Sequence, residues 1–546
     1  MFENIDVDGI DNPELKKFVV LLLNTIEQEL QKNRMLAEDN QRLRDENARL
    51  KGGNAKPRFP GSKPPQNHSS EQQRSEPKVW KKRPKKDQLV VTRTEAIRIP
   101  KSKLPTDAEF KGWEGYYVQE LHLVAEVICY KRAKYYSAST KKSFLAPLPA
   151  GCSGHFGPSM RSLALHLAYA GNMSQAGVHT LFTDAGILIS AGQVNNLLVN
   201  GHEALHANSH EVTIAGLASS KWQHTDHTAT RVNGKNQQCQ VLCNSLYSAF
   251  QTTPTKDRLA VLRALLAGAP FTYVCDSAAL AYLQNYALSK SLRRRIEALF
   301  SEQDPLSEAQ FSQHLDAMAD LGPRQRKIVR EALAISGYHL QTEVPVIKML
   351  LCDDAPQFNF ITDDLSLCWV HDARNYKKLN PVVCHHRIVL GCFMTQYWNL
   401  YKAFNTYRSA PAQEEAKRLE AEFDALFSTV TDYQALNDRI AKTRANKVQL
   451  LHVLRHPEIL LHNNPAELAA RRRVRKRDVS FGPRSDPGRQ AWDTFMTLSE
   501  TAKKLGVSFL HYLQDQLSEK SGRTSLADTV RQRAPLLNLD ASWDTG

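Results

Sequence analysis

The first fifty residues carry a leucine repeat that is typical of a coiled-coil helix. Leu22, Leu36, Leu43 and Leu50 follow a seven-residue spacing, which Glu29 interrupts once. The other core positions of the heptad are Ile26, Asn33, Asn40 and Asn47. Asparagine at such a position fixes the register and the number of helices at a cost in stability. The pattern therefore predicts a dimerising coiled coil over residues 13–51, with a solvated single helix as the alternative.

Two different patterns follow between residues 89 and 215. Over residues 89–150 apolar and polar side chains alternate in short runs, which predicts a small β module. Over residues 154–215 the apolar spacing is helical and is broken at Gly171, Gly186 and Gly192. Three short helices joined by glycine-containing turns are compatible with a helix-turn-helix and also with ordinary core packing. This stretch is therefore predicted to be helical, with DNA binding as one of two interpretations.

The second half of the chain alternates strand and helix patterns over residues 220–515. Residues 221–230 and 239–250 have strand-like patterns around Asn233-Gly234, a dipeptide that favours a hairpin turn. Residues 346–351 form an apolar run that only a lysine interrupts, as in a mostly buried strand. The stretches 277–342 and 411–450 have helical patterns. The simplest architecture is an α/β fold with a mixed sheet, two helical insertions and a tail over residues 516–546.

Composition and charge narrow the class of protein. The 546 residues include 71 Lys and Arg against 57 Asp and Glu, and the formal net charge of +14 favours a polyanionic partner such as nucleic acid. The nine cysteines include no Cys-x-x-Cys pair, which favours reduced thiols in a cytoplasm over a disulfide framework. The apolar run nearest the start, residues 18–23, is too short to span a bilayer, and no export signal opens the chain. We therefore expect an intracellular protein that binds nucleic acid.

Basic residues gather in two places. Residues 52–88 are rich in Pro, Ser, Gln and Lys and predict a flexible linker with a phosphate-seeking cluster at its end. This cluster comprises Lys81, Lys82, Arg83, Lys85 and Lys86. The second group has six positive charges within residues 471–477, and we expect Arg471, Arg475 and Lys476 to line DNA. A solvated tether and a solvated basic helix are the alternatives for the two groups.

Three acidic residues stand at the ends of predicted elements, where a fold can bring them together. Asp226 lies within the first strand, Asp353 follows the apolar run 346–351, and Glu467 lies in the first turn of a helix. Carboxylates are suitable ligands for Mg²⁺ or Mn²⁺, and two such ions can clamp a phosphoryl group during transfer. Each residue also has a plainer explanation, since Glu467 fits a capping box, Asp353 a turn and Asp226 an ordinary strand position.

Four segments of the sequence together resemble a known family. They are Trp222-Gln-His-Thr-Asp226, the run from Cys368-Trp-Val-His371 to Lys378, Leu461-His-Asn-Asn-Pro-Ala-Glu467 and Thr501-Ala-Lys-Lys-Leu-Gly506. Through these segments the sequence resembles the DDE transposases of the insertion-sequence family sixty-six over residues 150–515. The Asn-Asn-x-x-Glu segment that ends at Glu467 is the most specific part of the resemblance.

The resemblance implies an RNase H-like fold in which an Asp-Asp-Glu triad binds two Mg²⁺ or Mn²⁺ ions. Asp226 falls on the first acid and Glu467 on the third. For the second acid we expect Asp353, because it leads directly into the family segment that begins at residue 368. Asp276 is the alternative, since it also ends a strand-like run and lies closer to Asp226 in the sequence.

The resemblance also implies an activity and a set of partners. We expect a DNA transposase, cytoplasmic and associated with the bacterial nucleoid, that nicks the ends of its element and joins them to target DNA. Asn463 and Asn464 would orient Glu467 or the scissile phosphate. The partners would be terminal-repeat and target DNA, further copies bound through the coiled coil, and accessory transposition proteins as an option. The alternatives are a catalytically idle DNA-binding protein and a nuclease that cuts without joining.

One feature of the family is missing from this sequence. Related proteins carry a cysteine-rich zinc module after the basic linker, whereas the corresponding stretch here contains only Cys129, so thiols cannot form a zinc site there. The spacing of Cys368 and His371 with Cys384 and His385 superficially suits zinc. Because Cys368 and His371 match the catalytic-domain segment, we favour that interpretation over a structural zinc site.

Overall fold

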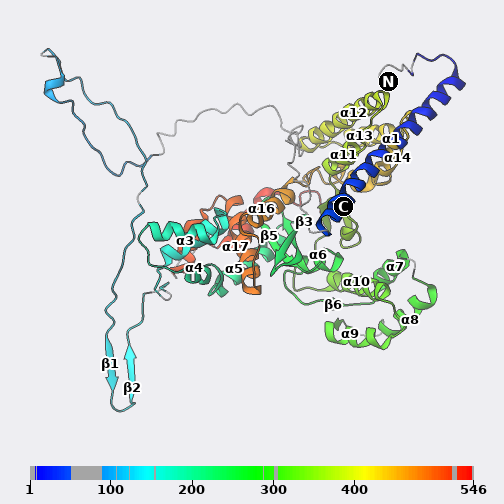
Figure 1. Ribbon diagram of the computed structural model, residues 1–546. Helices are drawn as coiled ribbons and strands as arrows, with labels where there is room; N and C mark the ends of the chain where they lie inside the picture. The colour runs from blue at the N-terminus through cyan, green and yellow to red at the C-terminus, as the bar shows by residue number, and fades with distance from the viewer. Residues whose placement is uncertain are drawn as a thin grey trace.

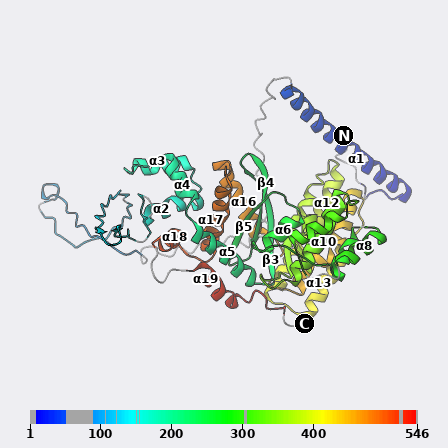
Figure 2. The ribbon, with the colours of Figure 1, turned by 90° about the horizontal axis from the view of Figure 1, so that it is seen from below.

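The computed structural model describes residues 7, 9–50, 89–105, 107–121, 123–149, 151–152, 155–286, 288–300, 305–518 and 525–543. In these parts of the chain a mixed five-stranded β-sheet lies between helices on both of its faces (Figures 1 and 2). The chain is therefore an α/β protein, as predicted. None of the described helices is both long and apolar enough to cross a membrane.

The five-stranded sheet has the strand order β5-β4-β3-β8-β9. Its strands are β3 (Trp222–Val232), β4 (Lys235–Cys243), β5 (Ser248–Thr253), β8 (Met349–Cys352) and β9 (Asp364–Leu367). The first three strands form an antiparallel meander, whereas β8 pairs parallel with β3 and β9 pairs parallel with β8. The central strand β3 therefore meets an antiparallel neighbour on one side and a parallel neighbour on the other.

The predicted hairpin between β3 and β4 is confirmed. Asn233 and Gly234 have φ angles of 49° and 75°, and a tight primed turn needs positive φ at both central residues. The prediction of one strand over residues 239–250 is wrong, because the structure divides it into β4 and β5. Asn244 Oδ1 accepts a hydrogen bond from the backbone N–H of Leu246 at 2.9 Å, and this local turn interrupts the strand.

Helices cover both faces of the sheet (Figure 2). The main ones are α16 (Asn464–Ser480) and α17 (Asp486–Lys504) on one face, and α6 (Arg258–Leu265) and α10 (Pro323–Leu340) on the other. Ala469 and Ala470 of α16 pack against Val241 of β4, whereas the next residue, Leu242, joins the core that includes α6. Neighbouring strand residues point to opposite faces. The two small alanines allow α16 to lie close to the sheet.

The two stretches that were predicted to be helical insertions are helical, and they belong to two lobes, one between β5 and β8 and the other between β9 and α16. The first follows the short strand β6 (Thr272–Tyr273), which pairs with β7 (Leu306–Ser307), and comprises α7 (Ser277–Asn285), α8 (Lys290–Phe300), α9 (Glu308–Ala317) and α10. The second comprises α11 (Trp369–Lys377), α12 (Cys384–Ser409), α13 (Gln413–Leu426), α14 (Gln434–Ala445) and α15 (Lys447–Leu450). Aromatic residues of α12 and α13 surround the fully buried ring of Trp369. The second lobe is thus anchored at the start of α11.

The predicted helical region and the carboxyl-terminal residues form a third lobe around α17. It comprises α2 (Pro158–Leu165), α3 (Gln175–Asp184), α4 (Ala191–Val199), α5 (Glu203–Ala218), α18 (Phe509–Leu517) and α19 (Leu526–Arg533). Residues 516–546 were predicted to be a tail, but their described part belongs to the fold. Leu526 and Val530 of α19 are buried, and Trp222 Nε1 donates a hydrogen bond to the Leu539 carbonyl at 2.6 Å.

The described part of residues 89–150 forms an extended arm (Figure 1). Within that part the strands are β1 (Lys134–Ser137) and β2 (Lys142–Leu145), which pair as a hairpin. Large apolar side chains are exposed along the arm, such as Tyr116 at 90% and Val127 at 96%. The prediction of a small β module is therefore wrong beyond the hairpin. Alternation favours strands, but a module also needs a second apolar layer, and the described arm lacks one.

The leucine repeat lies on one helix, α1 (Pro13–Leu50), whose amino-terminal half contacts the second lobe (Figure 1). The Glu27 carboxylate accepts hydrogen bonds from the backbone N–H groups of Val382 and Val383 at 2.9–3.0 Å, and Leu23 packs against Val383. The heptad leucines Leu22, Leu36, Leu43 and Leu50 are 47–80% exposed. Dimerisation through this helix stays a prediction. The linker cluster Lys81, Lys82, Arg83, Lys85 and Lys86 lies outside the described residues.

Candidate functional site

The central strand carries the first predicted acid on the face that α16 covers. Asp226 stands opposite Val241 in the register of β3 and β4, and Val241 packs against Ala469 and Ala470 of α16. Side chains of directly opposed residues point to the same face of an antiparallel pair. The Asp226 carboxyl therefore points toward the helix that carries Glu467.

The second predicted acid lies at the end of the neighbouring strand. In the parallel pair of β3 and β8, His224 stands beside Leu351, so the same register continued by two residues brings Asp353 beside Asp226. Asp353 follows the last residue of β8 and is half-buried. The alternative second acid, Asp276, lies outside this sheet. It caps α7 by accepting a hydrogen bond from the backbone N–H of Ala279 at 2.9 Å.

Asn463 fixes the start of α16, and with it the position of Glu467. Asn463 is 1% exposed, and its side-chain amide donates to the Thr225 carbonyl at 2.7 Å. Its Oδ1 lies 3.0 Å from His224 Nδ1, and burial lowers the pKa of His224 to about 3, so the neutral ring donates this bond. The amide thus ties α16 to the residues just before Asp226. Asn464, which is half-buried, is the first residue of the helix.

The charges of the three acids act on one another. Burial is the main cause that raises the pKa of Asp226 to about 7, and the nearby Asp353 and Glu467 carboxylates raise it further. The backbone N–H of His227, which donates to Asp226 Oδ1 at 2.7 Å, and the guanidinium of Arg374 act in the opposite direction. Charged groups shift one another's pKa in this way only when they lie close together. The Asp353 and Glu467 carboxylates therefore lie near enough to Asp226 to act on its charge, and these three residues are called the acidic group below.

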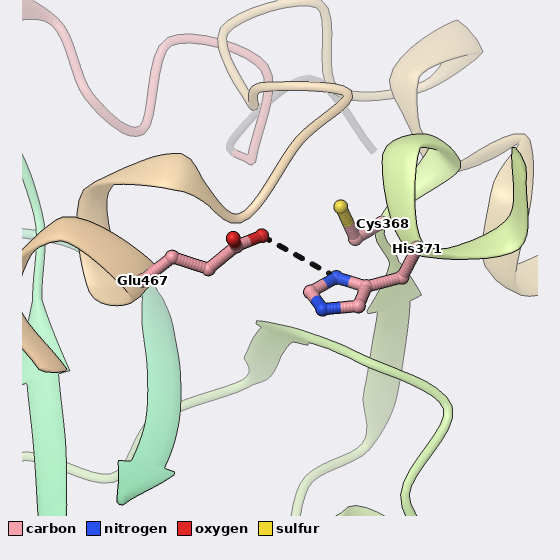
Figure 3. Close-up of side chains that lie close together, drawn as sticks. All are labelled: Cys368, His371 and Glu467. Carbon is pink, nitrogen blue, oxygen red and sulfur yellow. Dashed lines mark ion pairs between the residues drawn. The ribbon is translucent and has the colours of Figure 1, made fainter. Parts of the chain in front are cut away.

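Glu467 also contacts two residues of α11, Arg374 and His371, and Figure 3 shows the second of these contacts. Its Oε2 accepts a hydrogen bond from Arg374 Nη2 at 2.9 Å, and its Oε1 lies 3.5 Å from His371 Nδ1. Arg374 Nη1 lies 2.9 Å from His371 Nε2. Arg374 was not among the site residues expected from the sequence. The available signal was the spacing of His371 and Arg374, three residues apart, because such residues are neighbours on one helix face.

Cys368 completes a compact cluster with His371 and Glu467. One potential ligand atom from each lies within 4.8 Å of the others. Burial raises the pKa of the Cys368 thiol to about 12, and its sulfur accepts a hydrogen bond from the backbone N–H of Asn463 at 3.2 Å. These observations describe a neutral thiol in a packing role. His385, part of the four-residue zinc alternative, instead lies 3.5 Å from the Asp432 carboxylate.

The acidic group has the donor chemistry to hold a divalent metal ion. Asp353 Oδ1 and Glu467 Oε1 are buried and have no hydrogen-bond partner. Leaving buried polar atoms without partners is costly, so native proteins rarely do it without a reason. Carboxylate oxygens are the ligands that Mg²⁺ and Mn²⁺ take in proteins. Asp226, Asp353 and Glu467 carry such ligand atoms, whereas the group of described residues whose possible ligand atoms lie within 4.8 Å of one another is Cys368, His371 and Glu467.

The basic residues of α16 divide into exposed and structural ones. Arg471 and Arg475 are exposed, so both can contact a polyanion. The prediction that Lys476 lines DNA is wrong, because this residue is 3% exposed and its ammonium donates to the carbonyl of Ala168. Burial lowers its pKa to about 8. Arg473 is also buried, and its partner is Asp493 of α17.

Comparison with known proteins identifies one relative. The chain is 32% identical over 307 residues to the uncharacterized protein y4jO of Sinorhizobium fredii, a match that covers 56% of this chain and 94% of y4jO. No family model matches the sequence. No solved structure matches it.

Proposed function

Because the chain belongs to the family of the uncharacterized protein y4jO, whose name states no activity, we propose its function from the site itself. The protein is a DNA transposase with an RNase H-like catalytic domain over residues 220–515. The observation that carries this proposal is that Asp226 on β3 is influenced by the charges of Asp353, at the end of β8, and of Glu467, in the first turn of α16, while one buried oxygen each of Asp353 and Glu467 lacks a hydrogen-bond partner.

The sheet supports the proposed fold. An antiparallel meander of three strands followed by two parallel strands, in the order β5-β4-β3-β8-β9, is the arrangement expected for an RNase H-like domain. In that arrangement the first and second acids stand on adjacent central strands and the third on a helix that covers them. Asp226 lies on β3, Asp353 follows β8 and Glu467 lies in the first turn of α16, which supports Asp353 over Asp276 as the second acid.

The chain's own residues would position and neutralise the reacting groups. Asp226, Asp353 and Glu467 would hold two Mg²⁺ or Mn²⁺ ions, which when bound activate the attacking oxygen and stabilise the leaving oxygen. Asp226 must lose its proton to act as a ligand, and Asn463 keeps α16 in register with β3 while it does so. In phosphoryl transfer a protein contributes mainly by positioning the reacting groups and by neutralising their charge. The exposed Arg471 and Arg475 would supply charge to the DNA backbone.

The same proposal extends to partners and place of action. The net charge of +14 supports DNA as the partner, and the exposed heptad leucines of α1 support a homodimer or a larger assembly. We propose that such an assembly works on DNA at the bacterial nucleoid, with or without accessory proteins.

A strand-transfer assay tests the proposal. Labelled element-end DNA, target DNA and Mg²⁺ are mixed with the wild type or with Asp226→Asn, Asp353→Asn or Glu467→Gln. Loss of second-shell metal partners costs about 10–100-fold, so we expect these ligand variants to lose joining by at least roughly 100-fold. The matched controls are Asp354→Asn, the exposed neighbour of Asp353, and Asp276→Asn.

Each outcome distinguishes the proposal from its rivals. Joining that survives in both controls and is lost in the three ligand variants supports a transposase. Metal-dependent cutting without joined product indicates a nuclease with the same site. DNA binding without any metal-dependent cutting in the wild type contradicts the proposal and favours an idle DNA-binding protein.

A further inference from the structure

The side chains of Arg374 and His371 contact each other and the Glu467 carboxylate, and this pair of residues is called the brace below. They lie on the same face of α11, directly after β9, and their side chains are 29% and 25% exposed. Arg374 Nη2 donates to Glu467 Oε2 at 2.9 Å, while Nη1 lies 2.9 Å from His371 Nε2. The positive charge of Arg374 also acts on the Asp226 carboxyl across the acidic group. The brace therefore contacts Glu467 and carries a charge that acts on Asp226.

The chemistry of arginine fixes the orientation of the imidazole. A guanidinium has only donors, so Nη1 of Arg374 donates and Nε2 of His371 accepts. The proton of a neutral His371 then lies on Nδ1, which faces Glu467 Oε1 at 3.5 Å, a separation longer than a hydrogen bond. His371 thus holds the guanidinium on Oε2 and leaves Oε1 open. The brace therefore donates a hydrogen bond to Oε2 of Glu467 and none to Oε1.

The brace also balances charge. Three carboxylates repel one another in a partly buried site, and one guanidinium beside them offsets part of that repulsion. A divalent ion at Glu467 would need the same carboxylate and would itself repel the guanidinium. An ion at the open Oε1 and the guanidinium on Oε2 therefore compete for the same carboxylate, and the Arg374 side chain is 29% exposed to solvent.

We propose that Arg374 is a positioning residue that occupies the cation place on Glu467 until a metal ion displaces it, and that it then contacts a phosphate of the bound DNA. This inference rests on the proposed function, because it requires the acidic group to bind metal. A DNA phosphate near the ions supplies the negative charge that the released guanidinium needs, and arginine matches phosphate oxygens with two parallel donors.

A metal titration without DNA tests the inference apart from catalysis. Mn²⁺ binding to the full-length protein is followed by electron paramagnetic resonance for the wild type, Arg374→Ala, Arg374→Lys and Asp353→Asn. Lys377→Ala serves as the matched control, because Lys377 is exposed at the end of the same helix. A hydrogen bond between charged groups is worth about a tenfold change in equilibrium, so Arg374→Ala should bind Mn²⁺ roughly tenfold more tightly than the wild type. Arg374→Lys, which keeps the charge without the fork, should lie between them.

A second measurement tests whether Arg374 contacts a phosphate of the bound DNA. Cutting of element-end DNA at saturating Mn²⁺ should fall roughly tenfold in Arg374→Ala, since it loses a charged phosphate contact. Tighter metal binding together with slower cutting is a combination that a purely structural role does not produce. Arg374→Lys should recover part of the cutting rate.

The outcomes separate the inference from the proposed function. If the wild type binds Mn²⁺, Asp353→Asn weakens this binding and Arg374→Ala leaves it unchanged or weaker, Arg374 does not compete with metal and the inference is overturned while the metal site stands. If the wild type binds no Mn²⁺ and Asp353→Asn changes nothing, the proposed function is overturned together with the inference.

Discussion

Helix α16 takes part in two buried clusters of an acid with an arginine, and the two clusters differ in how their charges are satisfied. In the first turn, Glu467 has Arg374 on one oxygen and no hydrogen-bond partner on the other. Farther along, Arg473 meets Asp493 of α17, and both Asp493 oxygens accept hydrogen bonds, from Thr252 and from Arg473, at 2.7–3.0 Å. The Asp493 carboxylate is therefore closed, although Arg473 Nε is buried without a hydrogen-bond partner, whereas the Glu467 carboxylate is open at one oxygen.

This difference separates a structural ion pair from a candidate site. A buried pair that only holds elements together gains from filling every hydrogen-bonding position, because each unfilled position costs free energy. Where carboxylate oxygens stay unfilled and a neighbouring pKa is raised, the fold bears a cost that a ligand can offset. The open cluster at Glu467 is therefore the better candidate for a functional site. Four experiments test the contrast between the open and the closed cluster.

The largest effect is expected from opening the closed cluster. Asp493→Ala leaves the fully buried guanidinium of Arg473 without its charge partner, which costs about 3–5 kcal/mol in the free energy of unfolding. Urea denaturation measures this loss. As the control, Asp486→Ala removes an exposed carboxylate from the first turn of the same helix and should change stability by only about 0.5 kcal/mol. Equal losses in the two variants would contradict the closed-cluster account.

The open cluster should appear in the pH dependence of stability. Because the pKa of Asp226 is raised to about 7, the folded protein keeps a proton that the unfolded chain releases near pH 4. This carboxyl therefore stabilises the fold at low pH, and its contribution is lost as the pH rises from about 4 through about 7, by on the order of 4 kcal/mol at most.

Comparison with Asp226→Asn isolates that contribution. The variant cannot lose the proton, so its stability relative to the wild type should increase between pH 4 and pH 8. Thermal and urea unfolding in metal-free buffer measure the difference. Parallel pH profiles for the two proteins would show that Asp226 titrates normally and that the acids do not act on one another.

A smaller, local effect is expected at the docked helix α1. The Glu27 carboxylate accepts two backbone N–H groups at the start of α12, so it is a closed carboxylate like Asp493. Glu27→Ala should cost about 1–2 kcal/mol, as for loss of a helix cap, and should speed amide hydrogen exchange in the first half of α1. Glu29→Ala, at an exposed position, is the control. Unchanged exchange in Glu27→Ala would mean that other contacts hold the helix.

The smallest effect concerns the outer face of α16. Removing the exposed charges in Arg471→Ala/Arg475→Ala should lower the slope of log affinity for DNA against log salt by about 2, since each phosphate contact contributes about 0.9. Lys476→Met should leave this slope unchanged, because its ammonium already binds backbone carbonyls. A lower slope in Lys476→Met would contradict the division of α16 into exposed and structural cations.

Those features of the fold and of the candidate site that depend on the local sequence pattern could be predicted from the sequence. Asp353 follows an apolar strand, Glu467 opens a helix, and Asn233-Gly234 demands a hairpin, so each place could be expected from its neighbours. The break between β4 and β5 was missed because it depends on one side-chain hydrogen bond of Asn244.

The partners of the basic residues could not be predicted in this way. Lys476 bonds to Ala168, and Arg473 to Thr252, residues that lie hundreds of positions away in the sequence. A run of positive charges looks the same in a sequence whether it faces solvent or buried carbonyls. The contact of Arg374 with Glu467 depends in the same way on the packing of α11 against the start of α16.

The most direct test of the central claim is anomalous diffraction from crystals of the full-length protein grown with Mn²⁺. We expect anomalous peaks between the carboxylates of Asp226, Asp353 and Glu467, and we expect these peaks to be lost in crystals of the Asp353→Asn variant. An absence of manganese among these three carboxylates, or a peak confined to Cys368, His371 and Glu467, would contradict the central claim.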